Sequence, residues 1–173
     1  YEFDFSQSGL ERSLFKSKGF DRPITVPFCP ESPLSGVNHK DFINAMWYHR
    51  KISIPQNWGG KRILLNFGGV DYKSTIYLNG EEIFVHYGGS SSFAIDITAY
   101  VKAGNDLIVY VQDDLGSQLQ TAGKQSRRLY SYSCLYTRVT GIWQTVWLEA
   151  VSKGGLKLCR ITPDLDNKQF VFE

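Results

Sequence analysis

Carboxylate side chains are the candidates for acid–base chemistry in this sequence, and several of them stand in adjacent pairs. Hydrolysis of a sugar linkage needs two carboxyl groups held at a defined separation. The pair Asp113-Asp114 follows a hydrophobic run, and its members point to opposite faces if the strand continues. The pair Glu81-Glu82 follows an Asn-Gly turn, where we expect both side chains to be solvated. Neither pair has the arrangement of a catalytic acid and base.

Asp71 and Asp96 are single carboxylates that precede or interrupt hydrophobic runs. A short carboxylate in such a place usually accepts backbone N–H bonds within a turn, so we expect structural roles for both. A serine nucleophile is not indicated, because the sequence has no G-x-S-x-G motif. The serines of 88–92 lie between two expected strands rather than between a strand and a helix. We therefore predict that this chain supplies no catalytic residue.

The sequence also lacks metal and cofactor motifs. Its three histidines, His39, His49 and His86, are too scattered for a metal site. The cysteines are odd in number and have neither zinc spacing nor an obvious pairing: Cys29, Cys134 and Cys159. No phosphate loop or dinucleotide fingerprint occurs. We predict no metal, no cofactor and no disulfide framework.

The charges are few and mixed, with a net charge of +2. A nucleic-acid-binding surface would show clustered basic residues, so we expect no nucleic-acid partner. No apolar run approaches the roughly 18 residues of a membrane span, so we expect no membrane partner. The chain opens within an alternating segment, Tyr1 to Phe5. We therefore expect the parent sequence to begin earlier, which leaves open whether a signal peptide was removed.

The stretch from Asn66 to Gln112 organises the chain, because its hydrophobic residues recur with a period of two. That alternation is typical of strands with one buried face. Asn79-Gly80 separates two of the runs, and Asn-Gly supplies the positive φ angles of a tight hairpin turn. Four or five antiparallel strands are predicted within this stretch.

Further strands are expected at residues 1–5, 24–28, 46–54, 62–67 and 145–151. Single helical turns are expected near 10–15 and 97–102. Three prolines stiffen the loop at 27–36, and residues 113–128 form a long loop without periodicity. Loops of that length are usually functional or disordered. Many short strands without a long helix predict an all-β jelly-roll sandwich.

The sandwich is expected to occupy residues 1–152. Gly154-Gly155 marks a boundary, after which 156–161 and 169–172 are expected to be strands on either side of an acidic turn. We interpret residues 153–173 as a linker and the first strands of a following domain.

Five blocks of sequence resemble the N-terminal sugar-binding domain of family-two glycoside hydrolases, the group of β-galactosidases, β-glucuronidases and β-mannosidases. They occur in the order and at the spacing of that family, and the resemblance covers residues 1 to about 152. The blocks are VPFCPES (26–32), MWYHRKISIP (46–55), FGGVDYKSTIYLNGEEI (67–83), GGSSSFAIDIT (88–98) and TGIWQTVWLE (140–149). The resemblance implies a galactose-binding-domain-like jelly roll, in agreement with the hydrophobic pattern.

In that family an immunoglobulin-like sandwich follows, and then a (β/α)₈ barrel that carries both catalytic glutamates. The resemblance implies that the parent is a retaining glycosidase and that this chain is its non-catalytic accessory domain. The implied partners are a glycoside substrate and the two later domains of the same chain. A secreted or periplasmic location is implied for the parent, while its sugar, linkage and oligomeric state stay open.

Two loops match the parts of the family's domain that reach the barrel. The stiff loop offers Glu31 as a candidate substrate-binding residue, and the long loop with its continuation offers Lys124, Gln125, Tyr136 and Arg138. Lysine and glutamine can hydrogen-bond sugar hydroxyls, and a tyrosine ring can stack on a pyranose. The alternatives are that the stiff loop only plugs one end of the sandwich, and that Lys124 and Gln125 contact a neighbouring domain.

One departure from the family leaves the substrate open. β-Galactosidases and β-glucuronidases place an Asp six residues before the glycine of the G-I motif, and counting back from Gly141 gives Leu135. Leu135 offers no hydrogen bond, whereas Tyr136 beside it can stack. Two other functions stay open: a free-standing carbohydrate-binding module, and a sandwich that only positions neighbouring domains.

Overall fold

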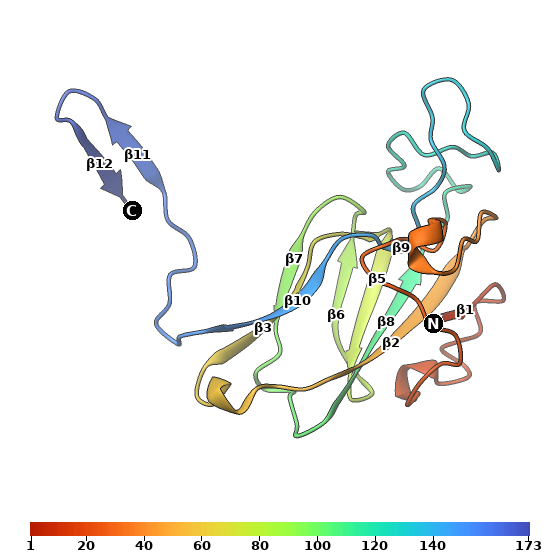
Figure 1. Ribbon diagram of the computed structural model, residues 1–173, viewed down its shortest axis with the longest axis horizontal. Helices are drawn as coiled ribbons and strands as arrows, with labels where there is room; N and C mark the ends of the chain where they lie inside the picture. Colours follow the sequence, from red (N-terminus) through yellow and green to blue (C-terminus); the bar gives the residue numbers. More distant parts are fainter.

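The computed structural model describes residues 1–173 and confirms a β-sandwich of two antiparallel sheets (Figure 1). The larger sheet has five strands in the order β1-β2-β8-β5-β6, and the smaller has three in the order β10-β3-β7. Their bounds are β1 Glu2–Phe3, β2 Ala45–Ile52, β3 Arg62–Phe67, β5 Lys73–Leu78, β6 Glu81–Tyr87, β7 Phe93–Asp96, β8 Asn105–Gln112 and β10 Val146–Val151. Three short 3₁₀ helices occur, at Leu14–Lys16, Pro33–Ser35 and Gln56–Trp58. None of the helices has the length and apolarity to cross a membrane.

The predicted hairpin at Asn79-Gly80 is confirmed and joins β5 to β6. Both turn residues have positive φ angles, 55° at Asn79 and 84° at Gly80, which is the geometry that suits the right-handed twist of the flanking strands. On its other side β5 pairs with β8, and β8 pairs with β2. The central alternating stretch therefore supplies three of the five strands of the larger sheet.

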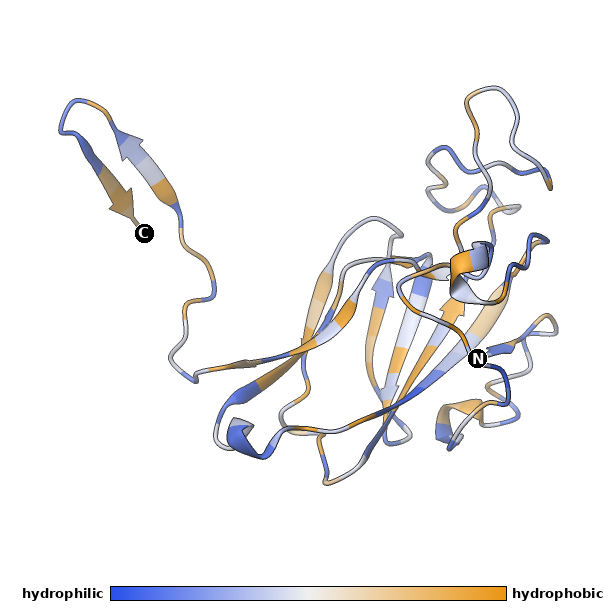
Figure 2. Ribbon diagram, viewed as in Figure 1, coloured by the Kyte–Doolittle hydropathy of each residue, from blue (hydrophilic) through white to orange (hydrophobic).

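Alternate residues of both sheets form the core between them. In β2 Met46 and Tyr48 point into this core, and in β3 Leu65 and Phe67 do so from the opposite sheet. Figure 2 shows the hydrophobic residues concentrated on the strands of the sandwich, with hydrophilic residues prevailing in many of the connecting loops. This core comprises fifteen buried residues, and a fully buried side chain of this size contributes about 1.5–3 kcal/mol.

The outer face of the larger sheet is also covered. Trp47 is fully buried there and stacks on Tyr110 with ring centroids 4.1 Å apart, and Phe15 stacks on Tyr77 at 5.3 Å. The buried carboxylate of Asp4 accepts a hydrogen bond from Trp47 Nε1 at 2.9 Å. The segment of residues 4–20 is held against the sheet by these contacts.

Two features lie at separate places around the sandwich. The short strands β4 (Val70–Asp71) and β9 (Gly141–Ile142) pair with each other, and the long loop that precedes β9 extends from this end (Figure 1). The hairpin of β11 (Ile161–Asp164) and β12 (Gln169–Phe172) follows β10 and stands apart from both sheets (Figure 1). The loop end and the hairpin therefore point in different directions.

The strand expected at 24–28 is wrong. Thr25 N donates to Ser35 O at 2.9 Å, and Phe28 N donates back to Thr25 O at 3.2 Å, so the backbone turns here. Pro27 has no N–H with which to continue a ladder. The strand expected at 1–5 is limited to Glu2–Phe3, because Gln7 N closes a turn onto Asp4 O at 3.0 Å.

Smaller differences concern the helical turns and the last strands. The turn expected near 10–15 is the 3₁₀ helix Leu14–Lys16, and that expected at 97–102 is one turn in which Tyr100 N and Val101 N both donate to Ile97 O. The strand expected at 156–161 begins only at Ile161 and includes Pro163. Proline is tolerated there because this two-stranded ladder leaves an outer edge unpaired.

Candidate functional site

The short strand β9 begins at Gly141, a position that only glycine fits. Its φ angle is +74°, and a Cβ atom there would lie 2.1 Å from Tyr48 Oη. The Tyr48 hydroxyl instead accepts a hydrogen bond from Ile142 N at 3.2 Å. Burial raises the pKa of Tyr48, so its hydroxyl stays neutral. These contacts fix the backbone of β9 against the end of the larger sheet.

Thr140, the residue before β9, holds two buried carboxylates. Its N–H donates to both carboxylate oxygens of Glu31, at 3.1 and 3.2 Å, and its Oγ1 donates to Asp113 Oδ2 at 3.1 Å. Gln120 Nε2 donates to the other oxygen of Asp113 at 2.6 Å. Burial raises the pKa of both carboxyl groups, and the hydrogen bonds partly offset that effect.

Asp71 of β4 is a third buried carboxylate, and it pairs with Gly141 across the β4–β9 ladder. Gln125 Nε2 donates to Asp71 Oδ2 at 2.6 Å. The same amide accepts from Val139 N through its Oε1 at 2.8 Å. Gly89 lies close on the other side, since a Cβ there would lie 2.4 Å from Asp71 Cγ. Asp71 is thus enclosed by the long loop, the β6–β7 loop and β9, and it is 6% exposed.

The surroundings of Asp71 make it a weak acid. Burial, reinforced by the charge of Asp113, raises its pKa to about 7, against the lowering effect of the Gln125 hydrogen bond. Near neutral pH the group is therefore divided between carboxylate and carboxylic acid. A carboxyl group in that state can accept or donate a hydrogen bond.

This arrangement suits hydrogen bonding better than bond cleavage. Glu31, Asp71 and Asp113 are each buried and already accept hydrogen bonds from the chain. A retaining glycosidase site needs two carboxyl groups about 5–5.5 Å apart on either side of the scissile bond. No group of three or more His, Cys, Asp or Glu residues is placed to hold a metal ion. The three cysteines are free thiols.

Of the five predicted binding residues, Glu31 belongs to this cluster and three others lie beside it. Gln125 points inward to Asp71, while Lys124 is exposed and Tyr136 is 65% exposed. Tyr136 N donates to Lys124 O at 2.8 Å, and Ser126 N donates to Tyr136 O at 2.7 Å. The two halves of the long loop are therefore joined where they leave the sandwich.

Glu31 and Arg138 occupy structural positions instead. Glu31 is 6% exposed and holds the N–H of Thr140. Arg138 is 2% exposed, and its guanidinium donates to the carbonyl oxygens of Lys40 and Arg128. It also lies over the ring of Phe42, 4.4 Å from the centroid. Both side chains anchor loops, which accords with the alternative that the stiff loop plugs one end of the sandwich.

Asp71 is the residue that the sequence reasoning missed. We expected it to accept backbone N–H groups in a turn, as Asp96 does from Thr98 N at 3.1 Å. Asp71 accepts from a side chain 54 residues away instead. Its position within the hydrophobic stretch around Val70 was the available signal of burial.

The sequence profile described as "Glycosyl hydrolases family 2, sugar binding domain" matches residues 9–148. The chain is 26% identical over 159 residues to a β-galactosidase of Thermoanaerobacter pseudethanolicus, covering 91% of this chain and 19% of that protein. It is 31% identical over 117 residues to a putative β-glucuronidase of Formosa agariphila, covering 67% of this chain and 13% of that protein. The chain thus spans a fifth or less of the length of these two relatives.

Solved structures share the fold. A β-glucuronidase of Ruminococcus gnavus in complex with N1-substituted uronic isofagomine matches with a TM-score of 0.75 and 22% identity, over 95% of this chain and 30% of that one. A β-glucuronidase of Lactobacillus rhamnosus matches with a TM-score of 0.69 and 24% identity, over 88% of this chain and 27% of that one. Profile and fold agree along most of the chain, which therefore belongs to the sugar binding domains of glycosyl hydrolases family 2.

Proposed function

We propose that this chain is the accessory domain that shapes one edge of the sugar pocket in a larger retaining glycosidase. The observation that carries the proposal is the Asp71–Gln125 contact at 2.6 Å, at the base of the loop that bears Tyr136. Relatives of this chain are named β-galactosidase and β-glucuronidase, and they are several times longer than the part it matches. The reaction proposed for the parent is hydrolysis of an O-glycosyl bond.

The chemistry of this end of the sandwich suits a sugar. Each sugar hydroxyl both donates and accepts hydrogen bonds. The buried carboxyl group of Asp71 holds Gln125, and with it the base of the loop that carries the exposed groups. Gln125 orients that carboxyl group. Tyr136 presents an exposed ring, and Lys124 an exposed ammonium group, on the same loop. Ligand sites commonly combine apolar surface with a few such polar groups.

The catalytic acids are assigned to another part of the parent. In this chain both oxygens of Glu31 and both oxygens of Asp113 accept hydrogen bonds from Thr140 or Gln120. A retaining mechanism needs a carboxylate oxygen that faces the anomeric carbon of the substrate. A carboxylate whose oxygens are held by hydrogen bonds inside the chain is poorly placed for that attack. The chain is therefore assigned a positioning role in the reaction.

Residues 153–173 are proposed as a linker and the start of a following immunoglobulin-like domain. The hairpin of β11 and β12 exposes large apolar side chains, among them Leu165 at 87%, Phe170 at 64% and Phe172 at 66%. An isolated two-stranded hairpin is marginally stable in water. Further strands of the same polypeptide would cover these side chains.

The proposal is tested on the longer polypeptide obtained by reading the gene beyond Glu173. In that protein we expect Asp71→Ala to lower kcat/KM for an aryl β-galactoside or β-glucuronide. One hydrogen bond to a charged group contributes about 1.5–3 kcal/mol, which corresponds to a loss of about 10- to 150-fold. Asp21→Asn, at an exposed carboxylate, is the matched control and should leave kcat/KM unchanged. Equal activity of the Asp71→Ala and control enzymes would remove the pocket-shaping role.

A further inference from the structure

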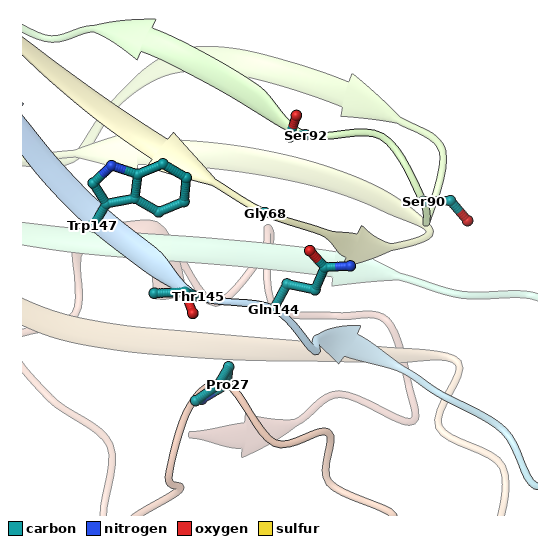
Figure 3. A pocket seen from close by; sticks show the side chains of 7 residues that line it. All are labelled: Pro27, Gly68, Ser90, Ser92, Gln144, Thr145 and Trp147. Atoms are coloured by element: carbon teal, nitrogen blue, oxygen red, sulfur yellow. The ribbon is translucent and has the colours of Figure 1, made fainter.

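A polar hollow lies on the smaller sheet, and none of the three buried carboxylates lines it. Its volume is about 520 Å³. Figure 3 shows the residues that line it, which come from the stiff loop at Pro27, the β3–β4 connection, the β6–β7 loop, and β10 with the chain leading into it. Six of its lining residues are Gly68, Ser90, Ser92, Gln144, Thr145 and Trp147. We name this hollow the Trp147 trough.

The trough is a built feature of the backbone. Gly68 lies at its floor, where a Cβ atom would stand 2.8 Å from Gln144 Cβ and 2.9 Å from Gln144 Oε1. Gly68 N donates to Thr145 O at 2.9 Å, which ties the floor to the chain entering β10. Trp143 Nε1 donates to Gly89 O at 2.8 Å and so fixes the loop that carries Ser90. These contacts hold the walls in place without filling the space between them.

Trp147 offers an apolar platform on the solvent side. Its neighbours Val146 and Leu148 pack into the core, so the alternation of β10 turns the indole outward, where it is 44% exposed. The picture places this ring at one end of the trough and Gln144 near the middle (Figure 3). A large exposed aromatic ring beside polar groups is typical of ligand sites.

The polar side chains around the ring have free hydrogen-bonding groups. Ser91, which points elsewhere, bonds to His86 Nε2 at 3.3 Å, whereas the side chains of Ser90, Ser92, Gln144 and Thr145 form no hydrogen bond within the chain. They provide hydroxyl and amide groups that can both donate and accept. No charged residue lines the trough, which disfavours an anionic ligand, because anions are bound by Arg, Lys or clustered N–H groups.

We propose that the Trp147 trough binds a neutral pyranose unit of an oligosaccharide. The apolar face of the ring would lie on the indole, while its hydroxyls meet the amide of Gln144 and the hydroxyls of Ser90 and Ser92. This inference goes beyond the pocket-shaping role, since it gives the chain a sugar site that is complete without any other domain. The Asp71 end and the trough are neighbours along the chain, since Gly68 precedes Asp71 by three residues and Ser90 follows Gly89, which lies against Asp71. The variants at Trp147, Gln144 and Asp71 therefore distinguish the two sites.

The test is an NMR titration of the ¹⁵N-labelled 173-residue chain with lactose and cellobiose, and with sodium glucuronate as the charged comparison. We expect saturable shifts of the Trp147 indole N–H and the Gln144 side-chain amide with a neutral sugar, and weaker shifts with glucuronate. Truncation of a central aromatic contact commonly costs more than 1 kcal/mol. Trp147→Ala should therefore weaken binding about tenfold or more, the factor equivalent to about 1.4 kcal/mol.

Tyr87→Ala is the matched control, because Tyr87 is an aromatic residue exposed to 61% on β6 outside the trough; it should leave the affinity unchanged. Gln144→Ala is the second variant if Trp147→Ala disturbs the dispersion of the spectrum, and it too should weaken binding. The inference is overturned if neither neutral sugar gives saturable shifts, or if both trough variants bind as the parent chain does. It is also overturned if the shifts map to Asp71 and Gln125 and vanish in Asp71→Asn, an outcome that would support the pocket-shaping role.

Discussion

The side-chain amide of Gln125 meets the carboxyl group of Asp71 at 2.6 Å, although 54 residues separate the two in sequence. Through its other end Gln125 holds the N–H of Val139 at 2.8 Å. The Gln125 side chain thereby links its own part of the long loop to Val139 near the end of that loop and to the buried carboxyl group of β4. The base of the loop and the acid should consequently respond together to any change at either residue.

The stability of the domain should depend on pH through Asp71. Burial raises its pKa to about 7 from an ordinary value of 3.8. Between these pH values the folded protein holds a proton that the unfolded chain has released, so the free energy of unfolding falls as pH rises. At about 1.4 kcal/mol per pH unit, the effect reaches up to about 4 kcal/mol, and it is complete above about pH 7.

Asp71→Asn removes this titration while keeping an oxygen that can accept from Gln125. We compare the free energies of unfolding of the variant and the parent chain by urea denaturation. The variant's value minus the parent's should increase steadily from about pH 4 to pH 7. For Asp21→Asn, at an exposed carboxylate, the free energy of unfolding should change with pH as it does in the parent chain. A gap for Asp71→Asn that is constant or shrinks over this range would show that the acid is not buried as described.

Gly141→Ala should destabilise the fold by about 3 kcal/mol or more. A left-handed backbone costs a non-glycine residue about 1–2 kcal/mol. The added Cβ would also stand 2.1 Å from Tyr48 Oη, and displacing that hydroxyl removes its bond to Ile142 N, a loss of about 1–3 kcal/mol for a buried group. Thermal and urea unfolding measure the change.

Gly104→Ala is the control for this substitution, because nothing lies within 4 Å of a Cβ at that glycine; we expect a change within about 0.5 kcal/mol. In the double variant Tyr48→Phe with Gly141→Ala, the nearest former clash is gone and part of the stability should return. Additive losses in the double variant would contradict the steric explanation.

Gln125→Ala should raise the pKa of Asp71 further, because the Gln125 hydrogen bond lowers it. The amide proton of Val139 should also exchange faster, since its acceptor is removed. The ¹³C shift of the Asp71 carboxyl group and amide hydrogen exchange report the two effects. Gln56→Ala, at an exposed glutamine, should change neither, and an unchanged Asp71 titration in Gln125→Ala would argue against the contact.

Arg138→Ala should loosen the long loop without altering the sheets. The guanidinium donates to the carbonyls of Lys40 and Arg128 and lies over Phe42, and such contacts contribute about 1.5–3 kcal/mol together with the ring. We expect lower thermal stability and faster proteolysis within residues 113–140. Arg127→Ala, at an exposed arginine, should match the parent chain in both assays. If it loosens the loop as much, the anchoring role of Arg138 is refuted.

Local pattern predicted the strands well wherever one face is buried. The alternation before and after Asn79-Gly80 fixed β5 and β6, and the parity of Trp147 against Val146 indicated which side chains of β10 share a face. Pattern failed at 24–28, where alternating residues lie in a turn because Thr25 bonds to Ser35 across a loop. A short alternating run cannot reveal such a non-local hydrogen bond.

The candidate site was less accessible to prediction, since its contacts join distant segments. Lys124, Gln125 and Tyr136 were proposed from the unpatterned loop and the family resemblance, and they stay predictions. Asp71 was missed because its partner lies across 54 residues. Arg138 was proposed as a sugar contact because it continues the loop that the family resemblance directs toward the barrel, whereas here two carbonyl groups and a ring enclose it.

The division of labour between this domain and the rest of its parent is tested most directly by assaying aryl β-glycoside hydrolysis with two proteins at equal concentration. One is the 173-residue chain, and the other is the polypeptide that continues beyond Glu173. We predict turnover by the longer protein alone, which should release the free sugar with retained anomeric configuration. Turnover by the short chain, lost on substituting Glu31, Asp71 or Asp113, would contradict the account.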